Sequence, residues 1–184
     1  MTSSPLGTAL DENALLPGAR SIPSPNNDER PQDAVVSLIV IHSISLPPGE
    51  FGGDAIERLF TNRLDPAEHP YYRTIHAETL RVSAHFLIRR DGSVIQFVPC
   101  NRRAWHAGQS NGRGRARCND FSAGIALEGG DDLPLEDAQY QALAHVIGVL
   151  RRSYPNAAIA GHADIAPHRK TDPGPCFDWS RVPE

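Results

Sequence analysis

The sequence predicts an α/β protein of one domain, with a central, mostly mixed β-sheet and helices packed on its faces. Residues 35–41 form a continuous apolar run rich in β-branched side chains, which is typical of a buried central strand. Residues 82–90 and 93–99 alternate apolar and polar side chains around Asp91-Gly92, a strong hairpin signal. Residues 137–154 carry apolar side chains at helical spacing, which predicts an amphipathic helix.

The N-terminal part of the chain holds few periodic apolar positions. Residues 1 to about 20 are therefore expected to be a flexible segment, and the domain is expected to span residues 21–184. Residues 21–33 are rich in Pro and Asn and predict a loop. The first strand, residues 35–41, follows this loop.

A long irregular connection is expected between the first strand and the hairpin. The stretch SLPPGEFGG (45–53) has two prolines and three glycines, which suit neither a helix nor a strand ladder. Residues 53–60 predict a short helix, and residues 65–72 return to loop. A connection this long inside a compact domain is usually functional.

The second half of the chain predicts a strand, a helix and a loop-rich tail. Residues 122–129 form another strand candidate. The helix at 137–154 has Arg151 and Arg152 in its last turn, which suits the negative end of the helix dipole, and Pro155 stops it. Its apolar stripe comprises Tyr140, Leu143, Ile147 and Leu150.

Composition and charge exclude several classes of protein. The 184 residues suffice for one buried core, and the net charge of -4 gives no electrostatic reason to expect a nucleic-acid partner. No run approaches the roughly 18 apolar residues that cross a bilayer. The N-terminus lacks a basic stretch and carries charges, so it does not read as a signal peptide. The three cysteines are widely spaced and predict no disulfide framework. These features favour a cytoplasmic protein.

Two separate regions hold candidate metal ligands. His42 stands directly after the first strand, where a loop begins, and such strand ends often carry sites. The tail GHADIAPHRKTDPG (161–174) concentrates His162, Lys170 and Asp172. Catalytic zinc uses three protein ligands and one open position, which His42 and two donors of the tail could supply. A polar surface tail with capping aspartates would also explain these residues.

Several motifs together resemble the AmpD-type zinc amidases, which are related to bacteriophage amidases and peptidoglycan recognition proteins. The motifs are SLPPGEFGG after His42, RVSAHFLIRRDG, RAWHAG, RCNDFS and GHADIAPHRKTDPGPCFDW. The similarity runs from about Ala19 to Trp179. The resemblance implies hydrolysis of the amide between 1,6-anhydro-N-acetylmuramic acid and L-alanine in recycled muropeptides. It also implies a cytoplasmic enzyme whose loss raises the muropeptides that induce β-lactamase. We expect a monomer without nucleic-acid or membrane partners.

The resemblance also assigns roles to individual residues. His42, His162 and Asp172 match the family's zinc ligands, and Lys170 matches the lysine that assists at the carbonyl oxygen. The substrate-binding residues that it implies are Arg81 and Arg117, for carboxylates of the stem peptide, and Trp105, in the substrate groove. The histidines of the family motifs that are not zinc ligands, His85 and His106, are interpreted as structural or as supports of the ligands.

One position departs from the family pattern. The family strand reads GIELEG, and its first glutamate is the general base; residues 124–129 here read GIALEG, so Ala126 stands at that position. Alanine cannot accept a proton, and the chain is expected to be slow or inactive. Glu128 lies on the same face of the strand, but about 6–7 Å from position 126, which is far for a substitute base.

Two explanations of Ala126 remain open: an engineered Glu-to-Ala change that traps substrate, or a natural variant that binds muropeptide without cutting it. The complete His, His, Asp set argues against a non-catalytic binding protein, and Ala126 argues for it. A structural zinc protein is a third reading, but such sites are closed by four ligands rich in Cys. The sequence offers no evident fourth ligand.

Overall fold

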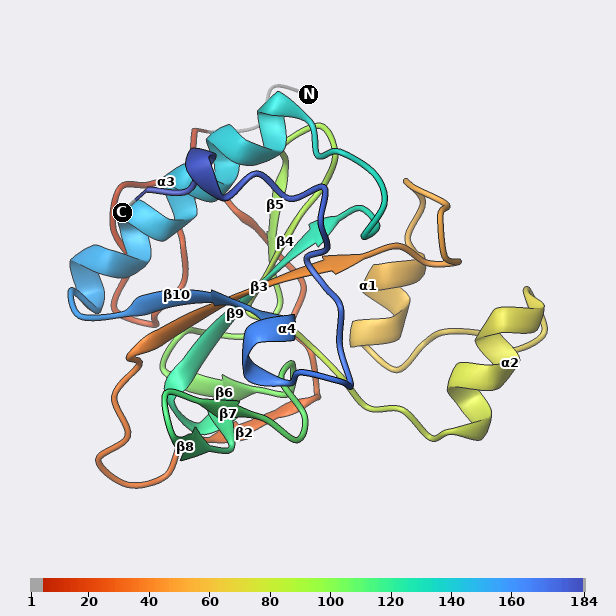
Figure 1. Cartoon of the computed structure of the whole chain (residues 1–184), viewed down its shortest axis with the longest axis horizontal. Helices are drawn as coiled ribbons and strands as arrows, with labels where there is room; N and C mark the ends of the chain where they lie inside the picture. The colour runs from red at the N-terminus through yellow and green to blue at the C-terminus, as the bar shows by residue number, and fades with distance from the viewer. Residues whose placement is uncertain (1–4, 184) are drawn as a thin grey trace.

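Six strands form one mixed sheet at the centre of the computed structural model, which describes residues 5–183 (Figure 1). From one edge to the other, the strands are β1 (Arg20–Ser21), β5 (Val94–Gln96), β4 (Phe86–Ile88), β9 (Ser122–Glu128), β3 (Leu38–Ile44) and β10 (Ala158–Gly161). Only the β4–β5 pair is antiparallel; the other four pairs are parallel. The predicted α/β class with a mixed central sheet is confirmed.

One face of the sheet is covered by α3 (Asp137–Ser153) (Figure 1). Its apolar stripe packs on the strand residues that point to this side, including Ile39, Ile41 and Ile125. A capping box between Glu136 and Gln139 begins the helix. The Gln139 side chain also donates to the Glu128 carbonyl at 2.9 Å, which ties the helix to the end of β9. The predicted helix at 137–154 is therefore confirmed.

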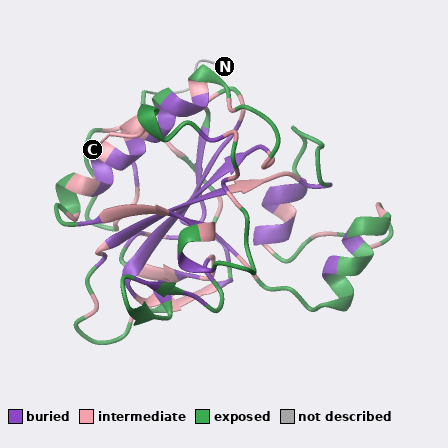
Figure 2. Ribbon diagram, viewed as in Figure 1, coloured by how far each residue is buried: buried purple, intermediate pink, exposed green. Residues whose placement is uncertain are grey.

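The other face is covered by shorter elements that leave space between them. The helix α1 (Ala55–Phe60) packs on the β4 and β5 side, α2 (Pro70–Ala77) lies beyond α1, and α4 (His162–Ile165) packs beside β3 and β10 (Figure 1). Figure 2 shows that the inner strands β4, β5 and β9 and most of β3 are buried, whereas β10 at one edge is half-buried.

The remaining elements are small. Two-stranded sheets join β2 (Asn27–Glu29) to β6 (Arg102–Ala104) and β7 (Asn111–Gly112) to β8 (Arg115–Ala116). Short 3₁₀ turns, η1 (Cys118–Phe121) and η2 (Trp179–Arg181), precede β9 and close the described chain. Within residues 5–183, no helix is both long and apolar enough to cross a membrane.

The predicted hairpin is confirmed between β4 and β5, which pair in antiparallel register. Its turn follows the Asp91-Gly92 signal: Gly92 has a φ of +81°, and Asp91 accepts a hydrogen bond from the Ser93 amide at 2.9 Å. A left-handed residue is most easily supplied by glycine. The strands themselves are shorter than the alternating runs, because residues 89–93 form the turn.

Several expectations about secondary structure need correction. Residues 21–33, predicted as a loop, contain the strand β2, which pairs with β6. The first strand covers residues 38–44 rather than 35–41, so His42 lies inside it and not after it. Pairing with β9 extends the strand, since Ser43 and Ile44 find partners there. Residues 70–72 belong to α2, not to a loop, because Pro70 stands at a helix start that His69 caps. The tail contains a strand, β10, that was not predicted because most of its residues are small.

The N-terminal segment packs on the molecule where the structure describes it. Leu16 is 3% exposed and belongs to the core beneath α3. The Gly7 and Thr8 carbonyls accept hydrogen bonds from His145 and Arg152 of that helix at 2.8 and 2.6 Å. We expected residues 1–20 to be flexible, whereas the described part of this segment makes these contacts. Residues 1–4 lie outside the described chain. The few apolar residues of this segment suffice to anchor it.

Candidate functional site

Three metal-ligating side chains converge at the face of the sheet opposite α3. His42 comes from β3, His162 begins α4, and Asp172 comes from the tail. The His42 Nδ1 and His162 Nδ1 atoms lie 3.0 Å apart, and each lies 3.1 Å from Asp172 Oδ2. The sequence predicted this trio across a separation of 130 residues between His42 and Asp172, and the fold brings its members into one cluster.

The local structure explains how each donor is aimed. Strand alternation puts His42 on the same face as Leu38 and Val40, away from α3. The amide of Ala163 donates to the Asp172 carbonyl at 2.9 Å, which brings the tail against α4. Gly161 permits this approach, because a Cβ there would lie 2.8 Å from Pro173 Cδ.

Each histidine turns its Nδ1 atom toward the cluster and binds a second group through Nε2. His162 Nε2 lies 3.2 Å from the Ala107 carbonyl oxygen, and His42 Nε2 lies 2.9 Å from His106 Nδ1. A carbonyl can only accept, so His162 Nε2 carries the proton and its Nδ1 atom presents a lone pair. Metal-bound histidines usually engage their second ring nitrogen in this way.

Burial and mutual contact determine the charge of the cluster. Burial lowers the pKa of His42, and the hydrogen bond with Asp172 only partly opposes this effect. Burial alone would raise the pKa of Asp172, but the adjacent rings of His162 and His42 outweigh this effect and hold that pKa well below its usual value. These shifts favour a carboxylate at Asp172 and a neutral imidazole at His42, which is the protonation state that metal ligands need.

The donor set fits a zinc ion. Tetrahedral zinc with bonds of about 2.0–2.1 Å places its ligand atoms about 3.3 Å apart, close to the separations of 3.0 and 3.1 Å found here. Two imidazole nitrogens and one carboxylate oxygen leave one tetrahedral position open. No cysteine belongs to the cluster. Within residues 5–183, no second group of three or more possible metal ligands is found.

A cavity of about 470 Å³ opens beside the three donors. Its wall includes Lys170 and Ala126 together with residues of α1 and α2. Ala126 is the direct partner of His42 in the parallel pairing of β3 and β9, so a longer side chain at position 126 would extend beside the ligands. Lys170 is exposed. The fold thus brings together Lys170, position 126 and the three donors that the sequence singled out.

Glu128 lies outside this cavity. Its side chain is 3% exposed and pairs with Arg89 at 2.9 Å. The Glu128 carboxylate also accepts from the Gly52 amide at 2.7 Å, and Arg89 reaches Glu57 at 2.8 Å. These contacts hold the loop before α1 on the sheet, and the structure does not present Glu128 to a substrate.

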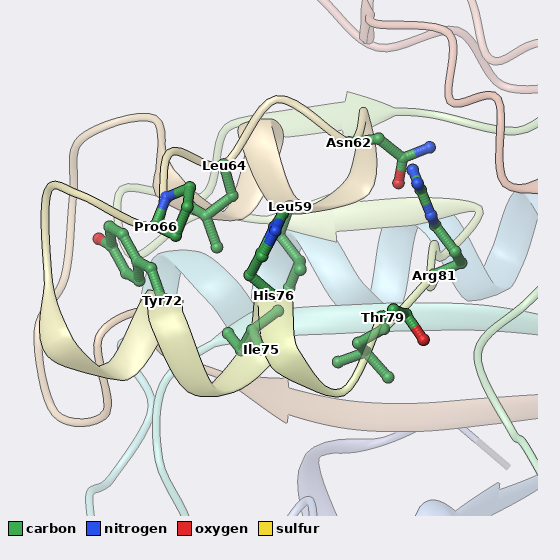
Figure 3. Close-up of a pocket in the computed structure, with 10 residues that line it drawn as sticks. Leu59, Asn62, Leu64, Pro66, Tyr72, Ile75, His76, Thr79 and Arg81 are labelled. Carbon is green, nitrogen blue, oxygen red and sulfur yellow. The ribbon is translucent and has the colours of Figure 1, made fainter.

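The three residues that the resemblance assigned to substrate do not line the main cavity. Arg81 lines a neighbouring cavity of about 230 Å³, which shares Leu59, Ile75 and Leu80 with the first. Figure 3 shows Arg81 beside Asn62 at one end of it. Arg117 is largely exposed and lies 3.1 Å from Asp120. Trp105 is half-buried, and its backbone amide bonds to Ser83.

Two further histidines of the motifs lie near the donors: His85 is buried, and His106 is half-buried and lines the cavity. His85 accepts from the Gly124 amide through Nδ1 at 3.0 Å, and burial lowers its pKa to about 3. His106 contacts His42 directly, and burial lowers its pKa as well. The family motifs led us to expect a structural or supporting role for both residues, but no local pattern indicated which of them would reach a ligand.

Comparison with known proteins places the chain in a family. The N-acetylmuramoyl-L-alanine amidase family model matches residues 32–175. The 1,6-anhydro-N-acetylmuramyl-L-alanine amidase AmpD of Escherichia coli (strain K12) is 58% identical over 174 residues, which are 94% of either chain. The crystal structure of a Se-Met AmpD derivative superposes with a TM-score of 0.90 at 57% identity, covering 92% of this chain and 95% of that one.

A more distant solved structure carries a ligand. It is the complex of the amidase AmiD from E. coli with the substrate anhydro-N-acetylmuramic acid-L-Ala-D-gamma-Glu-L-Lys. Its TM-score is 0.57 at 30% identity, over 84% of this chain and 59% of that one. The family model and the AmpD of E. coli each match well over two thirds of the chain. The chain therefore belongs to the N-acetylmuramoyl-L-alanine amidase family, among its AmpD members.

Proposed function

We propose that the chain is a zinc amidase that hydrolyses the amide between 1,6-anhydro-N-acetylmuramic acid and L-alanine, and that Ala126 impairs this activity. The observation that carries the proposal is the convergence of His42, His162 and Asp172 beside a cavity whose wall contains position 126. The AmpD relative supplies the substrate class through its name. The setting we propose is cytoplasmic cell-wall recycling by a monomer, in which loss of the enzyme raises muropeptides that induce β-lactamase.

The residues of the chain divide the work of hydrolysis. His42, His162 and Asp172 would hold a zinc ion, which when bound would lower the pKa of water toward about 7 and polarise a carbonyl. Lys170, on the cavity wall, would stabilise the negative charge that develops on the carbonyl oxygen. Water adds to the lactyl carbonyl carbon, the C–N bond breaks, and a carboxylate and the amine of L-alanine are released.

Position 126 decides how fast this reaction runs. A carboxylate there would take the proton of the attacking water and pass it to the leaving amine. Ala126 has no group that can do so, and Glu128 is engaged with Arg89. The chain should therefore bind zinc and muropeptide yet cut slowly, whether Ala126 is engineered or natural.

A second candidate function follows from the same observation. A chain with three metal donors, a cavity and no base could serve as a muropeptide-binding protein of the same fold. Binding without turnover would then be the biological role, and Ala126 is the feature that favours this reading.

The hydrolysis of an anhydro-muropeptide by the parent chain and by Ala126→Glu tests the proposal. Ala126→Glu should raise kcat by about 10²- to 10⁴-fold, the usual contribution of a positioned base. KM should change less, because the base acts mainly in the transition state. Full activity of the parent would refute the role given to position 126. Inactivity of both forms would favour the binding protein.

Metal analysis tests the cofactor separately. One zinc ion per chain is expected in the parent and in Ala126→Glu, and His42→Ala should lose it. Zinc-free parent protein, or unchanged zinc affinity in His42→Ala, would refute the metal site.

A further inference from the structure

A line of buried hydrogen bonds leads away from the metal donors. His42 Nε2 lies 2.9 Å from His106 Nδ1, and His106 Nε2 lies 3.1 Å from Ser122 Oγ. The Ser122 hydroxyl donates to the Cys118 carbonyl oxygen at 2.6 Å. Ser122 and Cys118 have no exposed surface, and His42 is 7% exposed.

The Cys118 carbonyl, at the far end of this line, determines which atom donates in each hydrogen bond. A carbonyl oxygen can only accept, so the single proton of the Ser122 hydroxyl points to Cys118. Ser122 Oγ must then accept from His106 Nε2, which leaves His106 Nδ1 without a proton. His106 Nδ1 in turn accepts from His42 Nε2. The proton of neutral His42 is thus held on Nε2, and its Nδ1 lone pair faces His162 and Asp172.

We propose that His106 and Ser122 are positioning residues that hold His42 in the tautomer able to bind metal through Nδ1. The inference rests on the proposed function for the metal itself, and it goes further by naming the groups that prepare one ligand before the metal arrives. His106 touches neither metal nor substrate in this role; it acts through the ring of His42.

The opposite proton placement has a structural cost. With its proton on Nδ1, His42 would donate to Asp172, which lies 3.1 Å away. His42 Nε2 would then accept from His106 Nδ1, and His106 Nε2 would need a donor. Ser122 could serve only by turning its proton away from the Cys118 carbonyl, which lies 2.6 Å from it. The Cys118 carbonyl, which begins η1, would then keep only its backbone partner and lose the short bond from Ser122, so the line disfavours the tautomer that blocks metal.

The packing around His106 supports this role independently. A Cβ at Gly124 would lie 2.5 Å from His106 Cγ, so only glycine lets the imidazole lie against β9. The same loop also serves the second histidine ligand, since the carbonyl of the next residue, Ala107, lies 3.2 Å from His162 Nε2. Asn119 fixes that loop by accepting from the amides of His106 and Ala107 at 3.2 and 2.8 Å.

Zinc affinity, measured by competition with a chelator, tests the proposal without recourse to turnover. His106→Leu should bind zinc about 10–100-fold more weakly, the usual cost of removing a partner of a metal ligand. His106→Asn should recover part of the loss, because its Oδ1 atom can accept near the place of Nδ1. Ser122→Ala should weaken binding in the same direction. Ser24→Ala is the matched control: it removes another buried hydroxyl, bonded to the Phe60 carbonyl, and should leave zinc affinity unchanged.

Nitrogen-15 NMR of the zinc-free parent tests the tautomers directly, whatever the stability of the variants. The expected spectrum shows His42 and His106 protonated on Nε2, and Ser122→Ala should reduce the Nε2 form of His42. A proton on His106 Nδ1 in the parent, or unchanged zinc affinity in both His106→Leu and Ser122→Ala, would overturn the proposal. Failure of the parent to bind zinc would instead refute the metal site, and the NMR result would still decide the direction of the hydrogen bonds.

Discussion

The two faces of the central sheet carry different kinds of side chain, although both sets come from the same strands. Beneath α3, the side chains of β3 and β9 are apolar and pack into a continuous core. On the other face, the neighbouring residues of the same strands include His42 and Ala126, which lie beside a cavity of about 470 Å³. One long helix seals the first face, whereas three short helices leave the second partly open (Figure 1).

This difference shows how a rigid site is built from ordinary strands. Because alternate residues of a strand point to opposite faces, each residue that seals the α3 side holds its neighbour in place on the cavity side. Ile41 and Ile125 are wholly buried beneath α3, and His42 and Ala126 follow them directly. A shift of β3 by one residue would exchange ligand and core.

Leu143→Ala should give the largest difference between the two faces, because it should lower stability without changing zinc affinity. Leu143 of α3 is fully buried, and removing it should lower the free energy of unfolding by about 2–5 kcal/mol. Zinc affinity of the folded variant should not change. Thr74→Ala, on the cavity wall, is the matched change and should alter stability by less than about 0.5 kcal/mol. Chemical denaturation checks both values; equal losses would contradict the division.

Glu128→Ala should destabilise the protein by about 3 kcal/mol, because Arg89 loses a buried carboxylate partner and keeps Glu57 and the Gly53 carbonyl. The same change in an Ala126→Glu background should leave kcat nearly unchanged, since Glu128 lies outside the cavity. Denaturation and turnover are measured on one sample. Loss of turnover with full stability would show that Glu128 acts as a base.

Low pH should reduce the stability of the folded protein through His85, on the cavity side of the sheet. Burial, with a smaller effect of the Arg30 charge, lowers the pKa of His85 from 6.5 to about 3. The unfolded chain takes up a proton near pH 6.5, and the folded protein resists until about pH 3. The stability due to neutral His85 is therefore complete above pH 6.5 and is lost as pH falls toward 3, by about 1.4 kcal/mol per pH unit.

The zinc-free protein and its His85→Asn variant check this expectation. The asparagine Oδ1 atom can still accept from the Gly124 amide, as His85 Nδ1 does, but it does not titrate. The variant should show a shallower fall in stability between pH 6 and pH 4. Identical slopes for the two proteins would exclude His85 as a source of acid sensitivity.

The smallest effects are expected at the rim of the open face. Arg81→Ala and Arg117→Ala should each weaken muropeptide binding by about 1 kcal/mol, or roughly fivefold, because a guanidinium group pairs well with carboxylates but is exposed here. Zinc affinity should not change. Calorimetry with an anhydro-muropeptide measures the effect, and unchanged affinity in both variants would remove them from the recognition surface.

Much of the fold could be predicted from local pattern. The hairpin at Asp91-Gly92 and the helix α3 carry strong signals, and both are present. The helix α2 was missed because Pro70 and its acidic neighbours looked like loop, although proline at a first helical position is itself a helix signal. The strand β10 has no signal of its own, because its four residues become a strand only by pairing with β3.

The candidate site depended on information that lies outside any local window. The spacing of His42, His162 and Asp172 was also compatible with a polar surface tail with capping aspartates. The family resemblance identified the three residues as ligands. Their convergence is now visible in the structure. The contact of His106 with His42 could not be predicted, since it depends on how a loop turns toward β9 and on the missing side chain of Gly124.

The packing of both chain ends has a practical consequence for handling this protein. The segment around Gly7 is bonded to α3 through His145, and the Pro183 carbonyl accepts from Arg151 of the same helix at 3.0 Å. Gly7 and Pro183, near the two ends of the described chain, therefore lie on the side of the sheet away from the cavity. A fluorophore, a purification tag or a sensor surface attached near either residue should leave the cavity facing solution.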